Sequence, residues 1–253
     1  MREIAGMSVL VTGGGSGIGA ACARWYVERG AQVTICGRRR DAIDAVAAAL
    51  GPHCRAVVAD VRVAADRDAA VATAVAHGGG LDALVSNAGN MYRGAITGLD
   101  EAALLDVFHT NVVGGMLLVG IAVPHLEQRR GAVVFVGSVH TRRAFPGASP
   151  YAATKGAVEA LTKVLAAELG PRGVRVNCVV PGAVPTELNE RAGVFDAATA
   201  AERYRALAAM HALGRIGEAH EVAEAIDHLL RAEWTTGAVL DVDGGLGLGV
   251  TNA

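Results

Sequence analysis

Two hydrophobic patterns alternate along the chain. Short runs rich in Val, Ile and Leu are separated by longer, alanine-rich stretches whose apolar residues recur at helical spacing. The short runs predict strands over residues 8–12, 32–36, 55–59, 81–86, 132–137, 175–180 and 239–242. The longer stretches predict helices over residues 18–30, 41–50, 66–76, 101–126, 151–169 and 218–230.

The alternation of strand and helix determines the expected fold. Continuous apolar runs suit strands that are buried on both faces, as in a parallel sheet, and each strand–helix–strand unit implies a right-handed crossover. We therefore expect an α/β protein: a doubly wound, Rossmann-like parallel sheet of about seven strands with helices on both faces, a three-layer sandwich. No linker, repeat or change in composition divides the chain, which predicts a single domain over residues 1–253.

The least regular segment covers residues 187–218 and follows a Pro-Gly-Ala-Val-Pro turn. A long connection inside a compact domain is usually a lid, a binding loop or disordered. We therefore expect this segment to form a cap over a substrate site.

Composition excludes several classes of protein. Apolar residues make up 52 % of the chain, which excludes a disordered protein, and the net charge of −2 gives no basic excess for binding nucleic acid. Residues 107–126 carry no formal charge but include Asn, Gly, Pro and His, so we expect a buried helix rather than a membrane span. The first residues lack a signal-peptide pattern, which predicts a cytoplasmic protein. The four Cys are far apart and the His residues lack metal-ligand spacing, so neither a disulfide nor a metal site is expected.

A glycine-rich turn joins the first predicted strand to the first predicted helix. It reads Thr-Gly-Gly-Gly-Ser-Gly-Ile-Gly over residues 12–19. Backbone amides at a helix N-terminus favour an anion, and glycines let a pyrophosphate approach the backbone. An ordinary glycine-rich turn is the alternative, but the position after the first strand of an α/β chain favours a dinucleotide site. No Lys follows the glycines, which disfavours a P-loop.

Tyr151 and Lys155 lie four residues apart at the start of a predicted helix, so their side chains point the same way. An ammonium lowers the pKa of a nearby phenol, so we expect the pair to exchange a proton near neutral pH. A surface pair on a helix is the alternative. Only two of the 23 basic residues are Lys, which indicates that a compact ammonium is needed at this position.

Two further polar residues stand out from their surroundings. Ser138 ends the fifth predicted strand, at the edge where open α/β sheets bind ligands, and its hydroxyl is expected to bind a substrate oxygen. A serine that only caps the strand is the alternative, and the absence of a GxSxG turn argues against a nucleophile. Asn111 lies inside an apolar helix although Asn is a poor helix former; a satisfied structural amide is its alternative reading.

Taken together, these residues resemble the short-chain dehydrogenase/reductase family. The turn over residues 12–19 is similar to the family's TGxxxGxG motif, and the similarity extends in order over almost the whole chain. The other matching segments are Asp60-Val61, Asn87-Ala88-Gly89, Asn111, Ser138, Tyr151-Ala-Ala-Thr-Lys155, Pro181-Gly182 and Asp243-Gly244-Gly245. The resemblance implies hydride transfer between a nicotinamide and a carbonyl or secondary alcohol.

The resemblance also implies a role for each residue. Tyr151 would transfer the proton, Lys155 would lower the pKa of Tyr151 and bind the nicotinamide ribose, and Ser138 would orient the substrate oxygen. Asn111 would bend its helix and complete a proton relay through a water. The residues implied to bind the cofactor are Gly13, Gly15, Ser16, Gly17, Ile18, Gly19, Asp60, Val61, Asn87, Ala88, Gly89, Tyr151, Lys155, Pro181, Gly182, Val184 and Thr186.

The end of the second predicted strand indicates which cofactor is preferred. A NAD site normally places a carboxylate there, but residues 35–40 read Ile-Cys-Gly-Arg-Arg-Arg, with Gly37 in the family's acidic position. The guanidinium groups of Arg38 and Arg39 suit a phosphate dianion. We therefore expect a preference for NADP, with NAD possible; a solvated basic turn is the alternative. Ser16 weakens the case, because NADP-dependent members often carry a basic residue at its position.

The substrate site is expected to form from residues 90–93, 139–145 and 187–211. Met91, Tyr92 and His140, together with Ser138 and Tyr151, are candidates to contact the substrate. Arg142 and Arg143 are expected in a solvent-facing turn, with contact to an acidic substrate group as the alternative. The sequence does not name the substrate.

Other readings remain open. A dinucleotide-sensing regulator on the same fold is one alternative, although such proteins tend to lack the Tyr/Lys pair. An epimerase or dehydratase of a related, longer family is disfavoured by the short C-terminal region and the Pro181-Gly182 loop. His211 replaces the Pro of a P-L-G-R-x-G run in the family, which leaves the loop geometry there open. The resemblance implies a homotetramer built through the helices over residues 101–126 and 151–169 and the glycine-rich C-terminus.

Overall fold

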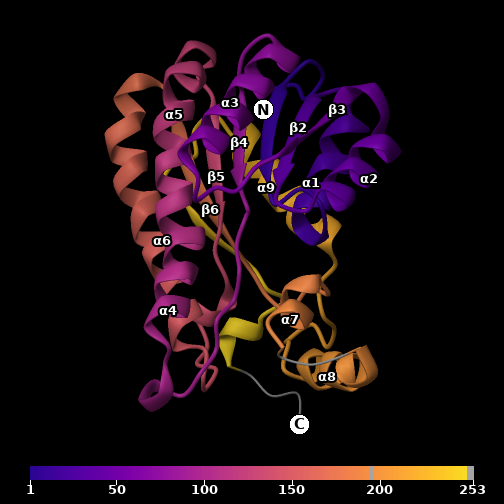
Figure 1. The fold of residues 1–253 in the computed structure, drawn as a ribbon, viewed down its shortest axis with the longest axis vertical. Coiled ribbons are helices and arrows are strands. Elements are labelled where there is room, and N and C mark those ends of the chain that lie inside the picture. Colours follow the sequence, from indigo (N-terminus) through magenta and orange to yellow (C-terminus); the bar gives the residue numbers. More distant parts are fainter. Residues whose placement is uncertain (194–196, 250–253) are drawn as a thin grey trace.

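Seven parallel strands form the centre of the fold, in the order β3-β2-β1-β4-β5-β6-β7, in a computed structural model that describes residues 1–193 and 197–249 (Figure 1). The strands are β1 (Ser8–Thr12), β2 (Gln32–Gly37), β3 (Cys54–Val58), β4 (Ala83–Ser86), β5 (Ala132–Val136), β6 (Arg175–Pro181) and β7 (Val239–Val242). The predicted doubly wound sheet is confirmed. The strand order reverses between β1 and β4, and open α/β sheets bind ligands in the crevice at such a point.

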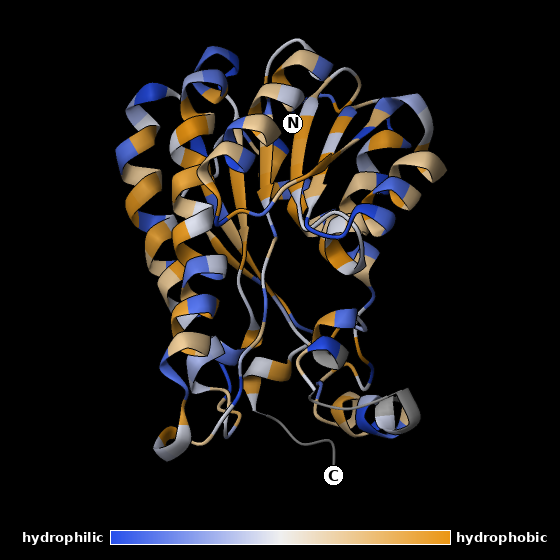
Figure 2. Cartoon of the chain, viewed as in Figure 1, coloured by the Kyte–Doolittle hydropathy of each residue, from blue (hydrophilic) through white to orange (hydrophobic). Residues whose placement is uncertain are grey.

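Helices cover both faces of the sheet and complete three layers (Figure 1). One face carries α1 (Gly17–Val27), α2 (Arg40–Leu50) and α9 (Ala219–Arg231). The other carries α3 (Ala64–Gly78), α5 (Gly114–Arg129) and α6 (Ser149–Leu169). The strands are almost uniformly hydrophobic while the helices alternate between apolar and polar faces (Figure 2), because only the strands are covered on both sides.

The helix predicted over residues 101–126 is not continuous. It consists of α4 (Glu101–Phe108), a π-helical turn (His109–Val113) and α5. Asn111 lies in the π turn and its side chain bonds outside the helix: Oδ1 accepts from the backbone N of Asn90 at 2.9 Å, and Nδ2 donates to Thr154 Oγ1 at 3.0 Å. A π turn inserts one extra residue into the helical ladder, and such turns are frequent at functional sites.

The stretch from Glu101 to Arg129 has the length and apolar character of a membrane span, with a mean hydropathy of 1.6. However, 56 % of the most apolar part of this stretch is buried inside the protein, where α5 packs against α3 and the π turn packs against α6. This stretch therefore belongs to the layer of helices that covers one face of the sheet.

The segment predicted as the least regular contains two helices, α7 (Glu187–Arg191) and α8 (Ala197–Ala209), which lie beyond the carboxyl edge of the sheet (Figure 1). His211 joins the end of α8 to the loop after β6. Its ring is 1 % exposed; Nδ1 donates to Leu207 O at 2.7 Å, and Nε2 accepts from the backbone N of Ala183 at 3.4 Å. The His that replaces the family's Pro thus fastens the cap to the sheet.

Candidate active site

A cavity of about 940 Å³ runs along the carboxyl ends of the strands. Its wall includes the glycine turn, the ends of β2 and β5, the start of α6, the loop after β6 and the cap helices. This volume lies within the range of ligand pockets in proteins, which is about 300–1,000 Å³. The cavity therefore brings together segments that are far apart in the sequence.

The glycine turn forms a cradle that side chains would fill. A Cβ on Gly13, which has a φ of +67°, would lie 2.9 Å from Asn87 Nδ2, and one on Gly19 would lie 2.3 Å from Gly13 O. Ser16 precedes α1 but its side chain caps no helix amide; its Oγ accepts from Arg39 Nη2 at 3.1 Å instead. The first amides of α1 thus lack a side-chain cap, and this arrangement fits a pyrophosphate.

The structure places most predicted cofactor residues on the cavity wall. The turn contributes Gly13, Gly15, Ser16, Gly17 and Ile18, and the remaining residues are Arg38, Arg39, Asp60, Val61, Asn87, Ala88, Gly89, Tyr151, Lys155, Pro181, Gly182, Val184 and Thr186. Gly19 is not on the wall. It lies one turn deeper, where its missing side chain lets α1 approach the Gly13 carbonyl.

Asn87 and Thr12 join the ends of β4 and β1 across the switch point. Asn87 Nδ2 donates to Thr12 O at 2.8 Å, while the backbone N atoms of Asn87 and Ala88 donate to Thr12 Oγ1 at 2.9 and 2.8 Å. These three bonds fix the floor of the cavity between the two strands.

Charged residues line the end of the cavity next to β2. Arg39 pairs with Glu187 of α7 at 2.7 Å, and Arg191 Nε lies 4.0 Å from the same carboxylate. Arg191 and Arg38 also line the wall. Asp60 is paired with Arg62 at 2.6 Å, which lowers the pKa of its carboxyl. Arg191 was not singled out in the sequence, because nothing local in the cap relates it to β2.

Ser138, Tyr151 and Lys155 meet on the wall beyond the glycine turn. The Ser138 hydroxyl lies close enough to the Tyr151 phenol to lower its pKa. The ammonium of Lys155 donates to Val136 O at 2.8 Å and lies 5.4 Å from the centre of the Tyr151 ring. The three side chains are buried, at 8 %, 5 % and 6 % exposure. A phenol, a hydroxyl and an ammonium at one point of a cavity wall can exchange a proton with a bound ligand.

The sequence predicts that Lys155 lowers the pKa of the Tyr151 phenol, and for the protein chain by itself this prediction is wrong. Burial raises the pKa of Tyr151 to about 12, opposed only in part by the hydrogen bond to Ser138. Burial also lowers the pKa of Lys155 to about 8. Burial removes the Tyr151 phenolate or the Lys155 ammonium from water, and this costs free energy. The attraction between the two groups over several ångströms is smaller than that cost.

Asn111 does not line the cavity. Its amide holds the backbone of Asn90 through both N and O, at 2.9 Å each, and it reaches Thr154 on α6. Asn111 is thus satisfied by protein groups beneath the wall, and it lies in the π turn that interrupts its helix. No contact between Asn111 and Lys155 is present among the described residues.

The candidate substrate residues divide into two groups. Met91 and His140 line the cavity, and His140 Nδ1 lies 3.0 Å from Ser138 Oγ. Tyr92 does not line it, because its hydroxyl turns outward and accepts from the backbone N of Asp100 at 2.7 Å. Arg93 takes the place expected for Tyr92, and Arg203 of α8 lines the wall opposite the sheet. Neither arginine follows a motif that the sequence could reveal.

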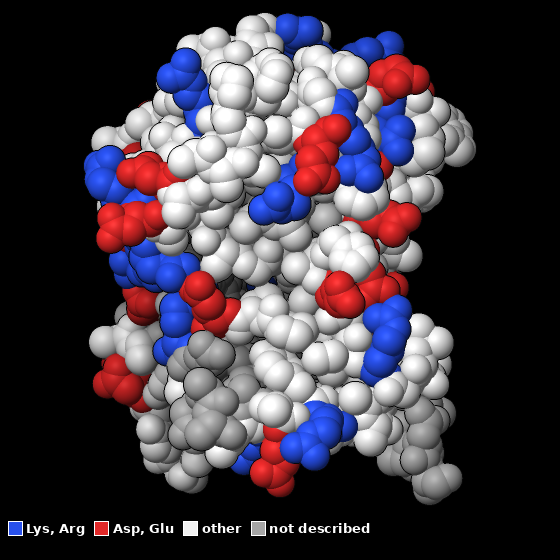
Figure 3. Space-filling view, turned by 90° about the vertical axis from the view of Figure 1, so that its right-hand side faces the viewer, with Lys and Arg blue, Asp and Glu red and all other residues white. Residues whose placement is uncertain are grey.

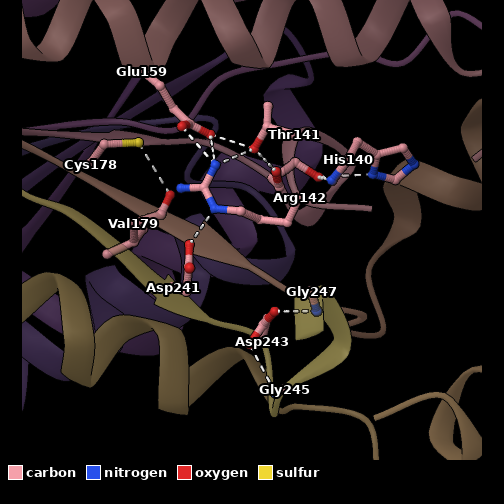
Figure 4. A network of polar contacts seen from close by, with 11 residues as sticks. His140, Thr141, Arg142, Glu159, Cys178, Val179, Asp241, Asp243, Gly245 and Gly247 are labelled. Carbon is pink, nitrogen blue, oxygen red and sulfur yellow. Dashed lines mark hydrogen bonds and ion pairs between the residues drawn. The ribbon is translucent and has the colours of Figure 1, made fainter. Parts of the chain in front are cut away.

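Arg142 and Arg143 neither face solvent freely nor reach the cavity. The guanidinium of Arg142 points away from the His140 ring and lies between two carboxylates (Figure 4), Glu159 at 2.8 Å and Asp241 at 3.0 Å. Arg143 donates to the backbone O of Leu246 at 3.3 Å. Both side chains therefore tie the loop after β5 to the C-terminal part of the fold.

Among the described residues, no group of three or more His, Cys, Asp and Glu is suited to a metal ion. The four Cys thiols are free and buried. Burial raises the pKa of Cys22 and Cys36 to about 12. Thiols with such high pKa values are poor nucleophiles.

The doubly wound sheet, the glycine cradle and the Ser/Tyr/Lys cluster define a nicotinamide-dependent oxidoreductase. Residues 13–247 match the family model described as enoyl-(acyl carrier protein) reductase. The chain is 39 % identical over 250 residues to the L-fucose dehydrogenase of Bos taurus, covering 97 % of this chain and 91 % of that protein. It is 35 % identical over 249 residues to dehydrogenase/reductase SDR family member 4 of Homo sapiens, covering 96 % and 88 %.

Among solved structures, the chain resembles the 3-ketoacyl-(acyl-carrier-protein) reductase of Brucella melitensis complexed with NADH. The TM-score is 0.89 at 32 % identity, over 96 % of this chain and 99 % of that one. The chain therefore belongs to the short-chain dehydrogenase/reductase family and is an NAD(P)-dependent oxidoreductase.

Proposed function

We propose that the enzyme transfers a hydride between NADP and a carbonyl or secondary alcohol, with Tyr151 as the general acid and base. One observation carries the proposal: Tyr151, Ser138 and Lys155 lie on the wall of the same cavity as the glycine cradle. The relatives named above are a fucose dehydrogenase and a ketoacyl reductase, whose names both describe this class of reaction.

The protein's own residues would bind the substrate and move the proton. Ser138 donates a hydrogen bond to the substrate oxygen and fixes it beside the phenol. Tyr151 gives its proton to this oxygen in reduction and recovers it in oxidation. Lys155, whose ammonium is held by Val136 O, is placed to bind a ribose hydroxyl of the cofactor. The nicotinamide supplies or accepts the hydride when it is bound.

The preference for NADP is supported by the basic end of the cavity. Arg38 and Arg39 follow β2, and Arg191 adds a third guanidinium from the cap. Glu187 already pairs with Arg39, so this carboxylate offsets part of the positive charge. Arginine suits a phosphate because its N–H groups match the oxygens in pairs.

The test is steady-state kinetics with both cofactors on a panel of ketones, quinones and acyl thioesters. We expect at least one carbonyl compound to be reduced, with a higher kcat/KM for NADPH than for NADH. A higher kcat/KM for NADH would reject the cofactor preference and leave the activity. Cofactor binding without turnover of any carbonyl or alcohol would favour the regulator reading instead.

We also propose a cytoplasmic homotetramer. Exposed apolar side chains on the long helices support the assembly, with Met116 at 45 % and Leu117 at 46 % exposure on α5 and Val164 at 62 % on α6. Multi-angle light scattering of the purified chain measures the mass directly. A monomer at micromolar concentration would contradict the tetramer, and recovery in the membrane fraction would contradict the location.

A further inference from the structure

The charge of the cavity differs from that of the protein as a whole. The chain has a net charge of −2, yet six of the described side chains that line the cavity are Lys or Arg and only one, Asp60, is acidic. Asp60 is itself paired with Arg62. On the outer face seen in Figure 3, blue and red side chains are scattered among each other and form no patch of one sign. Positive charge is thus concentrated inside the cavity.

Four of the six cations are accounted for by the cofactor and the proton transfer. Arg38, Arg39 and Arg191 lie at the end next to β2 and α7, where Glu187 contacts two of them. Lys155 belongs to the catalytic cluster. Arg93 and Arg203 remain, and neither is among the residues that the sequence predicts to bind the cofactor.

Arg203 lies on the inner face of α8. Arg203, Ala206, Leu207 and Met210 all line the cavity, and this spacing of three, four and seven residues is one face of a helix. Arg203 and Arg205 are both exposed, but Arg205 does not line the cavity, and its Nε donates to the backbone O of Ala201 at 3.4 Å. The cap therefore presents an apolar stripe that ends in one guanidinium.

Arg93 also lines the cavity, where its charge acts on His140, the neighbour of Ser138. It donates to Pro146 O at 2.8 Å, and this single bond leaves other N–H groups of the guanidinium available. Its charge contributes, after burial, to the low pKa of His140, which is about 4. His140 is therefore neutral at pH 7 and adds no charge beside Arg93. The nearby wall is apolar, formed by Met91, Phe145 and Leu246.

We infer that the enzyme acts on oxo acids, whose carbonyl meets Ser138 and Tyr151 while their carboxylate is held by Arg93 and Arg203 across an apolar chamber. Two guanidinium groups with no acidic side chain among the wall residues around them favour an anionic ligand. The carbonyl carbon gains a hydride from NADPH, the carbonyl oxygen gains the proton of Tyr151, and the products are a hydroxy acid and the oxidised cofactor. The inference rests on the proposed function and names its substrate class.

The experiment compares keto acids with their methyl esters, which differ in one charge. The full chain is assayed by NADPH absorbance with four compounds. These are levulinate, a second keto acid that is two methylenes longer, and the methyl ester of each acid. A charge-assisted hydrogen bond contributes about 1.5–3 kcal/mol, so we expect kcat/KM to be at least about tenfold higher for the acid of the better-fitting pair. Equal or faster turnover of both esters would overturn the inference and leave the proposed function intact.

Two variants and one control assign the effect to residues. In R93Q and in R203Q we expect the acid-to-ester ratio to fall about tenfold through KM for the acid, with ester kinetics and the Kd of NADPH unchanged. R205Q, on the same helix, is expected to behave as wild type. An unchanged ratio in both cavity variants, or a weaker Kd for NADPH as their main effect, would overturn the assignment. If no ketone is reduced with either cofactor, the proposed function fails together with this inference.

Discussion

The Lys155 ammonium lies 5.4 Å from the centre of the Tyr151 ring and donates to Val136 O at 2.8 Å. One turn of α6 thus presents both groups to the cavity, while the end of β5 holds the ammonium in place. Ser138, and not Lys155, lowers the pKa of the phenol, although burial raises this pKa by more. Tyr151 and Lys155 therefore line the cavity from adjacent positions and do not form a direct ion pair.

Replacing Tyr151 by Phe removes the proton donor and little else. General acid catalysis contributes about 10²–10⁴-fold, so we expect kcat to fall by that factor while the Kd of NADPH stays unchanged. Tyr92→Phe is the matched control, because that hydroxyl bonds to Asp100 outside the cavity and should leave kcat unchanged. Carbonyl reduction at the wild-type rate in Tyr151→Phe would reject Tyr151 as the acid.

The pKa of Tyr151, raised to about 12, predicts different pH profiles for the two directions. The phenol is protonated at neutral pH and ready for reduction, so the reduction rate should be flat from about pH 6 to 8. Oxidation requires the phenol to accept a proton and should accelerate as pH rises. Initial rates in both directions across this range provide the test. A reduction rate that falls tenfold per pH unit above neutrality would contradict the assignment.

His140 predicts a loss of stability in mild acid. Burial, with the charges of Arg93 and Lys155, lowers its pKa from 6.5 to about 4. Between these values the unfolded chain binds more protons than the folded one, so the free energy of unfolding falls as pH drops through this window. Urea unfolding at several pH values should give a free energy of unfolding that changes less steeply with pH in His140→Gln than in wild type. His220→Gln, at an exposed site, is the control; equal slopes in all three proteins would contradict the prediction.

Arginine replacements at the β2 end should change cofactor preference. Arg38→Gln is expected to raise KM for NADPH about tenfold and to leave KM for NADH unchanged, because only the former carries a 2′-phosphate. Glu187→Gln should lower KM for NADPH, because it frees Arg39 from its 2.7 Å ion pair with Glu187. Arg40→Gln, whose side chain does not line the cavity, is the control. Equal effects of Arg38→Gln on both cofactors would contradict a phosphate-binding role.

Gly19→Ala tests the cradle. Its Cβ would lie 2.3 Å from Gly13 O and 2.7 Å from Asn87 Nδ2, so the turn must shift. Overpacking of this kind costs about 1–3 kcal/mol of unfolding free energy, and the Kd of NADPH should weaken in parallel. Gly170→Ala meets no atom within 4 Å and should be close to neutral in both measurements. Wild-type stability and affinity in Gly19→Ala would show that close approach is not required there.

Much of the fold could be predicted because its signals are local. Buried strands such as β1 and β5 are continuous apolar runs, and the glycine turn sits where one such run meets a helix. The spacing of Tyr151 and Lys155 fixes their shared direction through the helical period alone. The resemblance implied a bend at Asn111, but the periodicity alone predicted an unbroken helix, since the Asn111 side chain bonds to Asn90, 21 residues earlier in the chain.

The amino-acid order by itself determined the doubly wound sheet, the glycine cradle and the shared direction of Tyr151 and Lys155, because each depends on neighbours within a few residues. Only the tertiary structure decided where the long polar side chains go. It sends Arg142 to Glu159 and Asp241, turns Tyr92 outward, and brings Arg93 and Arg203 to the lining of one cavity. The destination of a flexible charged side chain depends on partners that are distant in sequence, and burial then sets its charge state.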